Sequence, residues 1–275
     1  MKRFLVVFIA LFLSGCATSE VVESGGSSGY ENIELYTITD ADLDVTSDNP
    51  TEISFEENQP VYMIDSEGDY IISGKHEGQI QIDVQDRIVH LILDNVQLQS
   101  KEGPVIYVKS AAKVVITIPE NTHSVLKDST NYVNWENARA CIFSEDDLTI
   151  NGGGTLQAYG YCNDAIRTKD VLKILDVNVD IVSRGPGLRG NDGVLIQDAN
   201  LNVQCEETGI YTEKQNKKTQ GFVVVSGGTA KIISGEYGIN ASQNVYIREC
   251  SMDIYGMVQD IICSGEQYIQ EGCLE

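Results

Sequence analysis

A short phrase of apolar and polar positions recurs along the chain from Ile80 to Ile262. Each copy has an apolar residue, a polar stretch with a turn, and a second apolar run. The first apolar residues, which we call the anchors, are Ile80, Ile106, Ile142, Ile166, Leu188, Ile210, Ile239 and Ile262, at spacings of 26, 36, 24, 22, 22, 29 and 23 residues. Alternating Val, Ile and Leu predict short strands, and Gly- and Asp-rich stretches predict sharp corners. A repeat of this length and content predicts a β-solenoid with right-handed winding.

The two ends of the repeat region and two long spacings are less regular. Residues 31–79 contain IELYTITDADLDV, TEISFEEN and DYIISGKHEGQI, which predict strands that lead into the first coils and cap them. The long spacings predict insertions at 121–137, which carries the only tryptophan, Trp135, and at 213–220, which is polar. The expected fold is therefore all-β: a right-handed, single-stranded parallel β-helix with an N-terminal β cap.

The N-terminus has the pattern of an export signal. Lys2 and Arg3 precede an apolar run over 4–13, and Leu-Ser-Gly-Cys follows at 13–16. These four residues resemble a bacterial lipobox, which implies that Cys16 becomes a lipidated first residue; an ordinary signal peptide cut elsewhere is the alternative. We expect a lipoprotein signal peptide at 1–15, a lipidated cysteine with a flexible tether at 16–30, and one β-helix domain at 31–275. The chain would then be exported and held to the membrane by lipid.

Charge and cysteine content narrow the possible partners. The formal net charge is −22, and loss of residues 1–15 removes two positive charges and leaves −24. Nucleic acid and anionic membrane surfaces are excluded as partners, and an acidic ligand would need local basic side chains or a bound cation. Six cysteines follow Cys16, without a CxxC pair, so they are either disulfide-bonded or free thiols, and a zinc or redox motif is not supported.

Aspartates recur four residues after three consecutive anchors. They are Asp146, Asp170 and Asp192. In stacked coils such carboxylates lie about 4.8 Å apart and repel one another, so a calcium ion is a natural counter-charge. Oxygen ligands nearby in sequence are Asp147, Asp164, Asn163 and Asn191. The alternative is a set of solvated corner aspartates, because Asp favours turns.

The residue after each anchor forms a second row. Its members are Tyr107, Phe143, Arg167, Arg189, Tyr211, Asn240 and Cys263. Since the anchor points inward, this row should point outward. Exposed aromatic rings can stack on sugar rings, and arginine forks suit carboxylates, which predicts a ligand-binding row at Tyr107, Phe143, Arg167, Arg189 and Tyr211. The alternative is that the aromatics only stabilise the sheet and that the arginines pair with the aspartates.

Several phrases, in order, resemble a known family. VHLILDNVQL, GPVIYVKSAAKVVITI, ENARACIFSEDDLTINGGGTL, NDAIRTKDVLKI, GLRGNDGVLI and SGGTAKIISGEYGI are similar to the bacterial carbohydrate-binding parallel β-helix family, once a domain of unknown function. The resemblance implies calcium in the coil turns and binding of polygalacturonate and cellulose without catalysis. Its motifs place metal ligands at Asp146, Asp147, Asp164, Asp170 and Asp192. The Asp that precedes the anchor phrase in the family is kept only at Asp164 and Asp260, so fewer calcium sites are expected.

The leading hypothesis is an exported, lipid-anchored and monomeric protein that binds plant cell-wall type polysaccharide with structural calcium. Two alternatives stay open. The first alternative is a calcium-dependent lyase with Lys169 or Lys173 as its base. It is suggested by the family's similarity in shape to polysaccharide lyase family 9, whose members use calcium and a lysine base. The second is a cell-surface adhesin or structural spacer. His76, His90 and His123 share no repeat position, which disfavours histidine-based catalysis.

Overall fold

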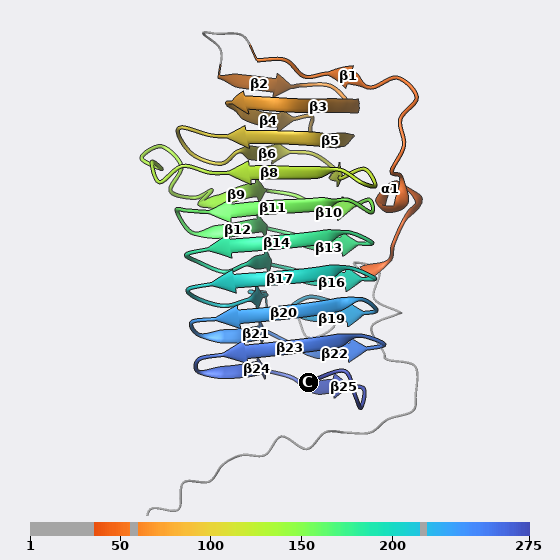
Figure 1. The fold of residues 1–275 in the computed structure, drawn as a ribbon, viewed down its shortest axis with the longest axis vertical. Coiled ribbons are helices and arrows are strands. Elements are labelled where there is room, and N and C mark those ends of the chain that lie inside the picture. Colours follow the sequence, from red (N-terminus) through yellow and green to blue (C-terminus); the bar gives the residue numbers. More distant parts are fainter. Residues whose placement is uncertain (1–35, 56–59, 215–218) are drawn as a thin grey trace, which may run out of the picture.

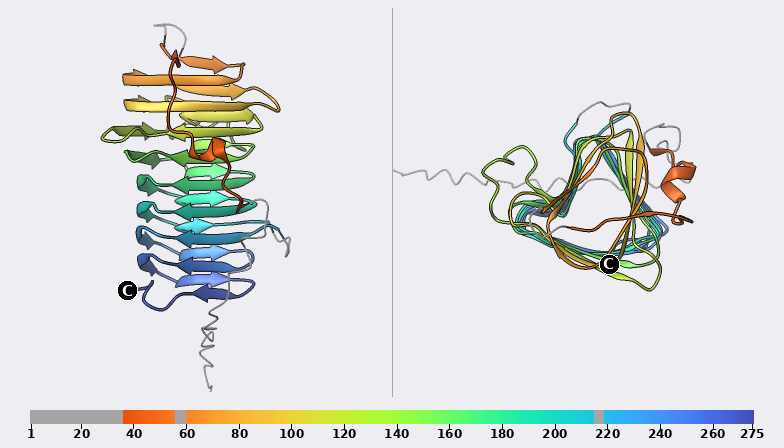
Figure 2. Two further views of the ribbon diagram at one scale, coloured as in Figure 1. Left: turned by 90° about the vertical axis from the view of Figure 1, so that its right-hand side faces the viewer. Right: turned by 90° about the horizontal axis from the view of Figure 1, so that it is seen from above.

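The computed structural model describes residues 36–55, 60–214 and 219–275, and these form a solenoid of parallel strands (Figure 1). Most coils contribute one strand to each of three faces, which give a triangular cross-section when seen along the axis (Figure 2). One coil consists of β9 (Ala140–Ser144), β10 (Leu148–Asn151) and β11 (Thr155–Gly160), and we name the three faces after these strands. The chain winds in the right-handed sense, so the predicted right-handed parallel β-helix is confirmed.

The strands follow the faces in regular order. The β9 face also holds β2 (Val61–Ile64), β4 (Gln79–Asp83), β6 (Ile106–Ser110), β12 (Asp164–Thr168), β15 (Leu188–Gly190), β18 (Ile210–Tyr211), β21 (Tyr237–Ala241) and β24 (Gln259–Cys263). The β10 face holds β7 (Lys113–Thr117), β13 (Val171–Leu175), β16 (Gly193–Gln197), β19 (Phe222–Ser226), β22 (Val245–Arg248) and β25 (Gln267–Ile269). The β11 face holds β8 (His123–Lys127), β14 (Asn178–Ser183), β17 (Asn200–Cys205), β20 (Thr229–Ser234) and β23 (Ser251–Gly256). The long strands β3 (Gly68–Glu77) and β5 (Ile88–Gln99) begin the stack, with β1 (Thr51–Glu52) paired to β3; β5 runs through both the β10 and β11 faces and joins them in one sheet.

The anchors stack in register along the β9 face. Ile80 pairs with Ile106, and the ladder continues through Ile142 and the following anchors to Ile239. The last prediction was off by one residue, because Ile239 pairs with Ile261 and not with Ile262. The anchors from Ile80 to Ile239 are fully buried in one core that runs the length of the stack, as expected when each coil packs on its neighbours.

The corner between the β10 and β11 faces explains why Gly and Asp recur in the turns of the repeat. One residue there has a positive φ in coil after coil, such as Asp176 (46°), Asp198 (53°) and Gly152 (97°). Asn and Asp tolerate this left-handed conformation, but at Gly152 a Cβ atom would also lie 2.6 Å from the carbonyl oxygen of Ile118. At position 152, unlike the corners at Asp176 and Asp198, both backbone conformation and space therefore require glycine.

The N-terminal segment is not the strand that IELYTITDADLDV predicted. Residues 36–50 form a strap that runs along the outside of the β10 face and contains one short helix, α1 (Asp40–Leu43) (Figures 1 and 2). At one end of the strap the ring of Tyr36 stacks on Phe222, with centroids 5.8 Å apart, and its hydroxyl accepts a hydrogen bond from the Phe222 N–H. Gly193 lies beneath it, since a Cβ there would come within 2.1 Å of the tyrosine hydroxyl. The cap prediction holds only for 51–55 and 60–79, where β1, β2 and β3 lie.

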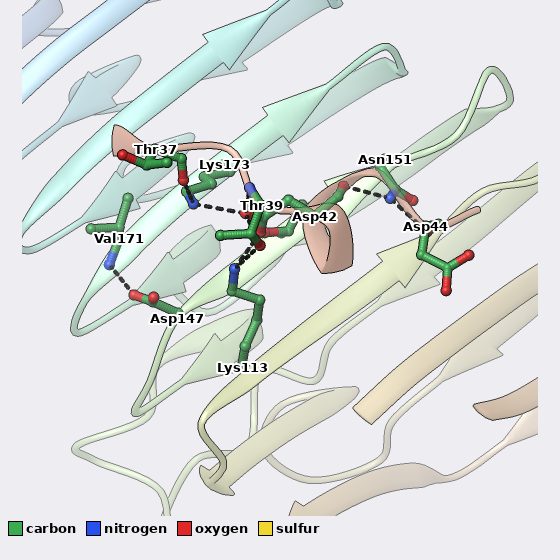
Figure 3. A network of polar contacts seen from close by, with 10 residues as sticks. Thr37, Thr39, Asp42, Asp44, Lys113, Asp147, Asn151, Val171 and Lys173 are labelled. Carbon is green, nitrogen blue, oxygen red and sulfur yellow. Dashed lines mark hydrogen bonds and ion pairs between the residues drawn. The ribbon is translucent and has the colours of Figure 1, made fainter. Parts of the chain in front are cut away.

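A buried ionic cluster fixes the strap to three successive coils (Figure 3). The carboxylate of Asp42, fully buried, accepts hydrogen bonds from Lys113 Nζ (2.7 Å), Thr149 Oγ1 (2.6 Å) and Lys173 Nζ (2.9 Å). Asn151 donates to the carbonyl oxygens of Asp42 and Asp44, each at 2.9 Å. Burial raises the pKa of Asp42, but the two lysines and Thr149 lower it more, so its net shift is downward. The strap is thus held by a carboxylate that stays ionised.

The insertions and cysteines complete the comparison with the sequence. The first insertion begins later than predicted, because β8 occupies 123–127 as a regular strand and the extra chain is 128–139. The second insertion includes 215–218, which lie outside the described residues, as do the predicted signal peptide, Cys16 and the tether. The six cysteines of the described chain are all free thiols. No helix in the described ranges is long and apolar enough to cross a membrane.

Candidate functional site

The predicted outward row lies on the β9 face in the expected register. Tyr107 pairs with Phe143, Phe143 with Arg167, Arg167 with Arg189, and Arg189 with Tyr211. The row continues to Asn240 and then to Ile262, so its predicted last member, Cys263, is wrong by the same single residue as the last anchor. Asp260 is likewise displaced: it follows Gln259, the residue that pairs with Tyr237, so it does not share the repeat position of Asp164.

The aromatic end of the row is covered. Phe143 is completely buried, contrary to the predicted exposed ring, because Tyr107 stacks on it with centroids 5.9 Å apart and the insertion packs beside it. Trp135, from that insertion, meets the Tyr107 ring edge-on at 5.0 Å. Trp135 also lies on Gly103, where a Cβ would come within 2.8 Å of the indole. Phe143 is therefore buried beside Tyr107 in the row, and Tyr107 and Trp135 form the partly exposed aromatic surface at this end.

The two arginines lie on adjacent coils around one buried carboxylate. Asp164 Oδ2 lies 3.9 Å from Arg167 Nε and 3.8 Å from Arg189 Nη1. Within the described chain no residue donates a hydrogen bond to Asp164 Oδ2 or accepts one from Arg167 Nε. Burial raises the pKa of Asp164 to about 7 although both arginines lower it, and burial with the neighbouring Arg189 lowers the pKa of Arg167. Asp164 and Arg167 therefore each keep unused hydrogen-bonding capacity.

Aromatic rings flank the arginines on both sides. The Arg167 guanidinium lies over the Phe143 ring at 5.5 Å, and that of Arg189 over Tyr211 at 5.0 Å. Such contacts limit the motion of each guanidinium group. Only 17% of the Arg167 side chain and 15% of the Arg189 side chain are exposed. The row therefore presents two partly buried guanidinium groups, not freely solvated arginines.

The aspartate ladder lies at the other end of the β9-face strands. Asp146, Asp170 and Asp192 follow β9, β12 and β15 at the corner that leads to the β10 face. Lys214 Nζ forms an ion pair with Asp192 at 2.5 Å and lies 3.9 Å from Asp170. Burial, followed by repulsion from Asp192, raises the pKa of Asp170 to about 6. The expected repulsion is present, and a lysine from the second insertion supplies part of the counter-charge.

The predicted calcium ligands do not converge on one point. Asp164 begins β12 whereas Asp170 follows its end, and Asp147 turns toward the β10 face, where it accepts a hydrogen bond from the Val171 N–H at 3.2 Å (Figure 3). Among residues 36–55, 60–214 and 219–275 no three Asp, Glu, His or Cys side chains are grouped closely enough to hold a metal. The side chains as they lie therefore do not fit a preformed calcium cage.

The two lysines considered as catalytic bases are both engaged. Lys173 lies beneath the strap on the β10 face, away from the row, and donates to Asp42 and to the carbonyl oxygen of Thr37 at 2.6 Å. Lys169 is on the β9 side but pairs with Glu145 at 2.6 Å. Lys173 therefore has no free amine for proton abstraction, whereas Lys169 is engaged only in an ion pair whose two side chains are 40% and 30% exposed.

A groove beside Trp135 was not predicted from the sequence. It encloses about 370 Å³ between the first coils and the insertion, with Gln79, Gln81 and Glu102 among its lining residues. Gln81 occupies the repeat position of Tyr107 one coil earlier, so the groove continues the row toward the N-terminal end. The signal in the sequence was the insertion itself, but its fold could not be inferred from a repeat that it interrupts.

Comparisons with known proteins agree with this geometry. Residues 58–266 match the family model described as carbohydrate-binding domain-containing protein. A protein of that description from Acetivibrio thermocellus is 33% identical over 276 residues, which cover 98% of this chain and 94% of the relative. The solved structure of a polysaccharide lyase-like protein from C. thermocellum, a gadolinium derivative, superimposes with a TM-score of 0.76 at 31% identity, covering 80% of this chain and 91% of that one. The chain therefore belongs to the family of carbohydrate-binding domain-containing proteins.

Proposed function

We propose that this protein is exported, anchored by lipid at Cys16, and binds an acidic, pectin-like polysaccharide along the β9 face as a monomer, without cleaving it. The observation that carries the proposal is the pair formed by Arg167 and Arg189, which stack on adjacent coils between aromatic rings. Arginine forks bind carboxylates through paired hydrogen bonds, and guanidinium groups fixed before binding lose less entropy when a ligand arrives.

The pair can accept a sugar carboxylate although Asp164 lies beneath it. Glu213 already forms an ion pair with Arg189, and its side chain is 47% exposed. An ion pair with such an exposed partner contributes about 0–1 kcal/mol, so a ligand carboxylate can displace Glu213 at small cost. Glu213 thus occupies the position that we assign to a uronate carboxylate.

Binding without cleavage is the better-supported activity. A lyase must remove a proton beside the uronate carboxylate. Lys173 is held by buried Asp42 on another face, and Lys169, the nearer candidate, pairs with Glu145. Purified protein should bind polygalacturonate in isothermal titration and should release no unsaturated product, measured by ultraviolet absorbance. Steady growth of that absorbance would establish the lyase alternative, and failure to bind any acidic or neutral glycan, with calcium present, would favour the adhesin or spacer.

Calcium stays a separate prediction, tied to the aspartate ladder. Asp170 lies in a cluster whose repulsion a cation would relieve, but Lys214 would have to leave Asp192 first. Calcium at a hundredfold excess over its Kd should stabilise the fold by about 2.7 kcal/mol, and Lys214→Gln should increase that gain. Melting curves with calcium and with chelator measure this gain for the original protein and for Lys214→Gln. If neither protein melts at a different temperature with calcium than with chelator, calcium does not bind the ladder.

The lipid anchor has its own test. In a bacterial host, the intact protein should incorporate labelled fatty acid and sediment with membranes, whereas Cys16→Ser should do neither, because acylation needs the thiol. A Cys16→Ser protein that still carries the label would contradict the anchor.

A further inference from the structure

Residues 270–275, which we call the C-terminal cap, close the last coil of the described stack. Gly272 has a φ of 83°, and a Cβ there would meet no atom within 4 Å, so this glycine serves the turn and not close packing. The turn brings Cys273 back against the coil, where it is only 2% exposed and belongs to the continuous core. The next residue, Leu274, forms a parallel bridge with Met252 of β23.

The cap is attached to β23 by this one bridge. The Met252 N–H donates to the Cys273 carbonyl oxygen at 2.8 Å, and the Glu275 N–H donates to the Met252 carbonyl oxygen at 3.0 Å. The pairing of β20 with β23 extends over six residues by comparison. Segments held by few backbone hydrogen bonds open at low free energy, so a covalent link at this point would stabilise the end of the core.

Two cysteines meet where the cap contacts the coil. The Cys250 N–H donates to Cys273 Sγ at 3.5 Å, and Cys250 packs against the core that contains Cys273. Both lie within two residues of the Met252–Leu274 bridge. Parallel strands lie about 4.8 Å apart, and a disulfide spans Cα atoms about 4.4–6.8 Å apart. The backbone therefore places these two thiols at a separation that a disulfide bond can bridge.

The other cysteines have different neighbours. Cys205 and Cys263 donate their thiols to carbonyl oxygens two residues further along the chain, and Arg139 donates to Cys162 at 3.3 Å. Cys141 is completely buried. Among the described residues no other two cysteines are joined by a hydrogen bond, so the fold selects one pair from six thiols.

We propose that Cys250 and Cys273 form a disulfide bond that locks the C-terminal cap onto the last coil when the chain folds under oxidising conditions. The oxidant is another disulfide, of a small molecule or of an oxidoreductase. The thiolate of one cysteine attacks it to give a mixed disulfide, and the thiolate of the second cysteine attacks that intermediate, which forms the new bond and releases the oxidant as two thiols. The pair gives up two electrons and two protons, and the two sulfurs of the oxidant take them up. The proposed export would supply such conditions.

Burial determines when the bond can form. Only a thiolate attacks a disulfide, and burial together with the neighbouring Cys273 thiol raises the pKa of Cys250 to about 12. At neutral pH the folded, reduced protein therefore holds very little thiolate at this position. The bond should form while the chain folds, and the native reduced protein should oxidise slowly.

The test refolds the full-length chain in a mixture of reduced and oxidised glutathione. The protein contains Cys16→Ser, so that only the six cysteines of the described chain remain. Free thiols are then alkylated in denaturant, and peptides are mapped by mass spectrometry. We expect one linkage, between Cys250 and Cys273, with the other four cysteines alkylated. Cys263→Ala, which removes a half-buried thiol from the same coil, is the matched control and should leave the linkage unchanged.

Hydrogen exchange tests whether the bond locks the cap. The Met252 and Glu275 amides should exchange about tenfold or more slowly in the linked protein than in the same protein after reduction. The double variant Cys250→Ala, Cys273→Ala should match the reduced protein with and without reductant.

The outcomes separate this bond from the proposed export. Alkylated Cys250 and Cys273 after refolding, or a link from either to another cysteine, would overturn the pair, and equal exchange in linked and reduced protein would overturn the lock. If the link forms on refolding but both thiols are reduced in protein taken from cells, the pair is supported and export is contradicted.

Discussion

Replacement of Asp42 by alanine should lower the free energy of unfolding by about 3–5 kcal/mol, because it leaves buried cations without their partner. The side chains of Lys113 and Lys173 are 11% and 5% exposed, and both ammonium groups donate to this one carboxylate. The strap should come off the β10 face so that both lysines regain water. Chemical denaturation measures the stability, and limited proteolysis within 36–50 measures the release of the strap.

Asp40 offers a matched control in the same helix. It is exposed, so Asp40→Ala should change stability by no more than about 0.5 kcal/mol. Equal stability of the Asp42→Ala and original proteins would show that the strap adds nothing to the fold. A triple variant in which Asp42, Lys113 and Lys173 all become apolar should recover much of the loss, since the buried charges are then removed together.

The pH dependence of this cluster has a definite sign. The folded state holds the pKa of Asp42 below its ordinary value, so the carboxylate contributes stability above the unfolded pKa of about 3.9. That contribution is lost as the pH falls through the folded pKa. The difference in stability between the original protein and Asp42→Ala should therefore be largest near neutral pH and should shrink below about pH 4. A difference that grew with acid would mean that the two lysines do not hold Asp42 ionised.

The solenoid could be predicted because its cause is local and repeated. Each anchor is an aliphatic residue that is followed within a few residues by a turn, and stacking of coils enforces one register. The error at Ile262 arose where two isoleucines are adjacent, so the pattern alone allowed either. The same adjacency misplaced Cys263 and Asp260.

The strap could not be predicted because its contacts are remote in sequence. Its apolar alternation suggested a strand, but Asp42 bonds to Lys113 and Lys173 across 71 and 131 residues. The Asp42 carboxylate also accepts a hydrogen bond from the Thr39 N–H at 2.9 Å, a helix-capping contact between residues three apart in the sequence. The strap is held to the coils, however, by the buried lysines and not by this local contact.

At the candidate site the order of residues could be predicted from the repeat, but their exposure could not. The position of Phe143 after its anchor was right, and its burial depends on where the 128–139 insertion folds. Lys214 occupies the next position of the ladder, four residues after the anchor Ile210, and its ammonium pairs with Asp192. The repeat predicted this position, but the direction of the side chain depends on the insertion that begins there, which carries no repeat signal.

Replacement of Arg189 by alanine should weaken binding of polygalacturonate about 10- to 100-fold, because a hydrogen bond to a charged group contributes about 1.5–3 kcal/mol. The substitution should also lower stability, because the Arg189 side chain is only 15% exposed and lies against buried Asp164. We therefore also expect a lower melting temperature. Arg189→Lys keeps the charge without the planar fork, so it should restore stability more fully than affinity.

Asp164→Asn separates the two effects of the arginine. It removes the buried carboxylate, so in that background Arg189→Ala should cost less stability than in the original protein, since no buried charge loses a partner. The loss of polygalacturonate affinity should remain, because it depends on the guanidinium and not on Asp164. If titration instead showed full affinity in the doubly substituted, folded protein, the acidic glycan would have to bind away from the arginine pair, and the groove beside Trp135, which continues the same row, would be the next surface to substitute.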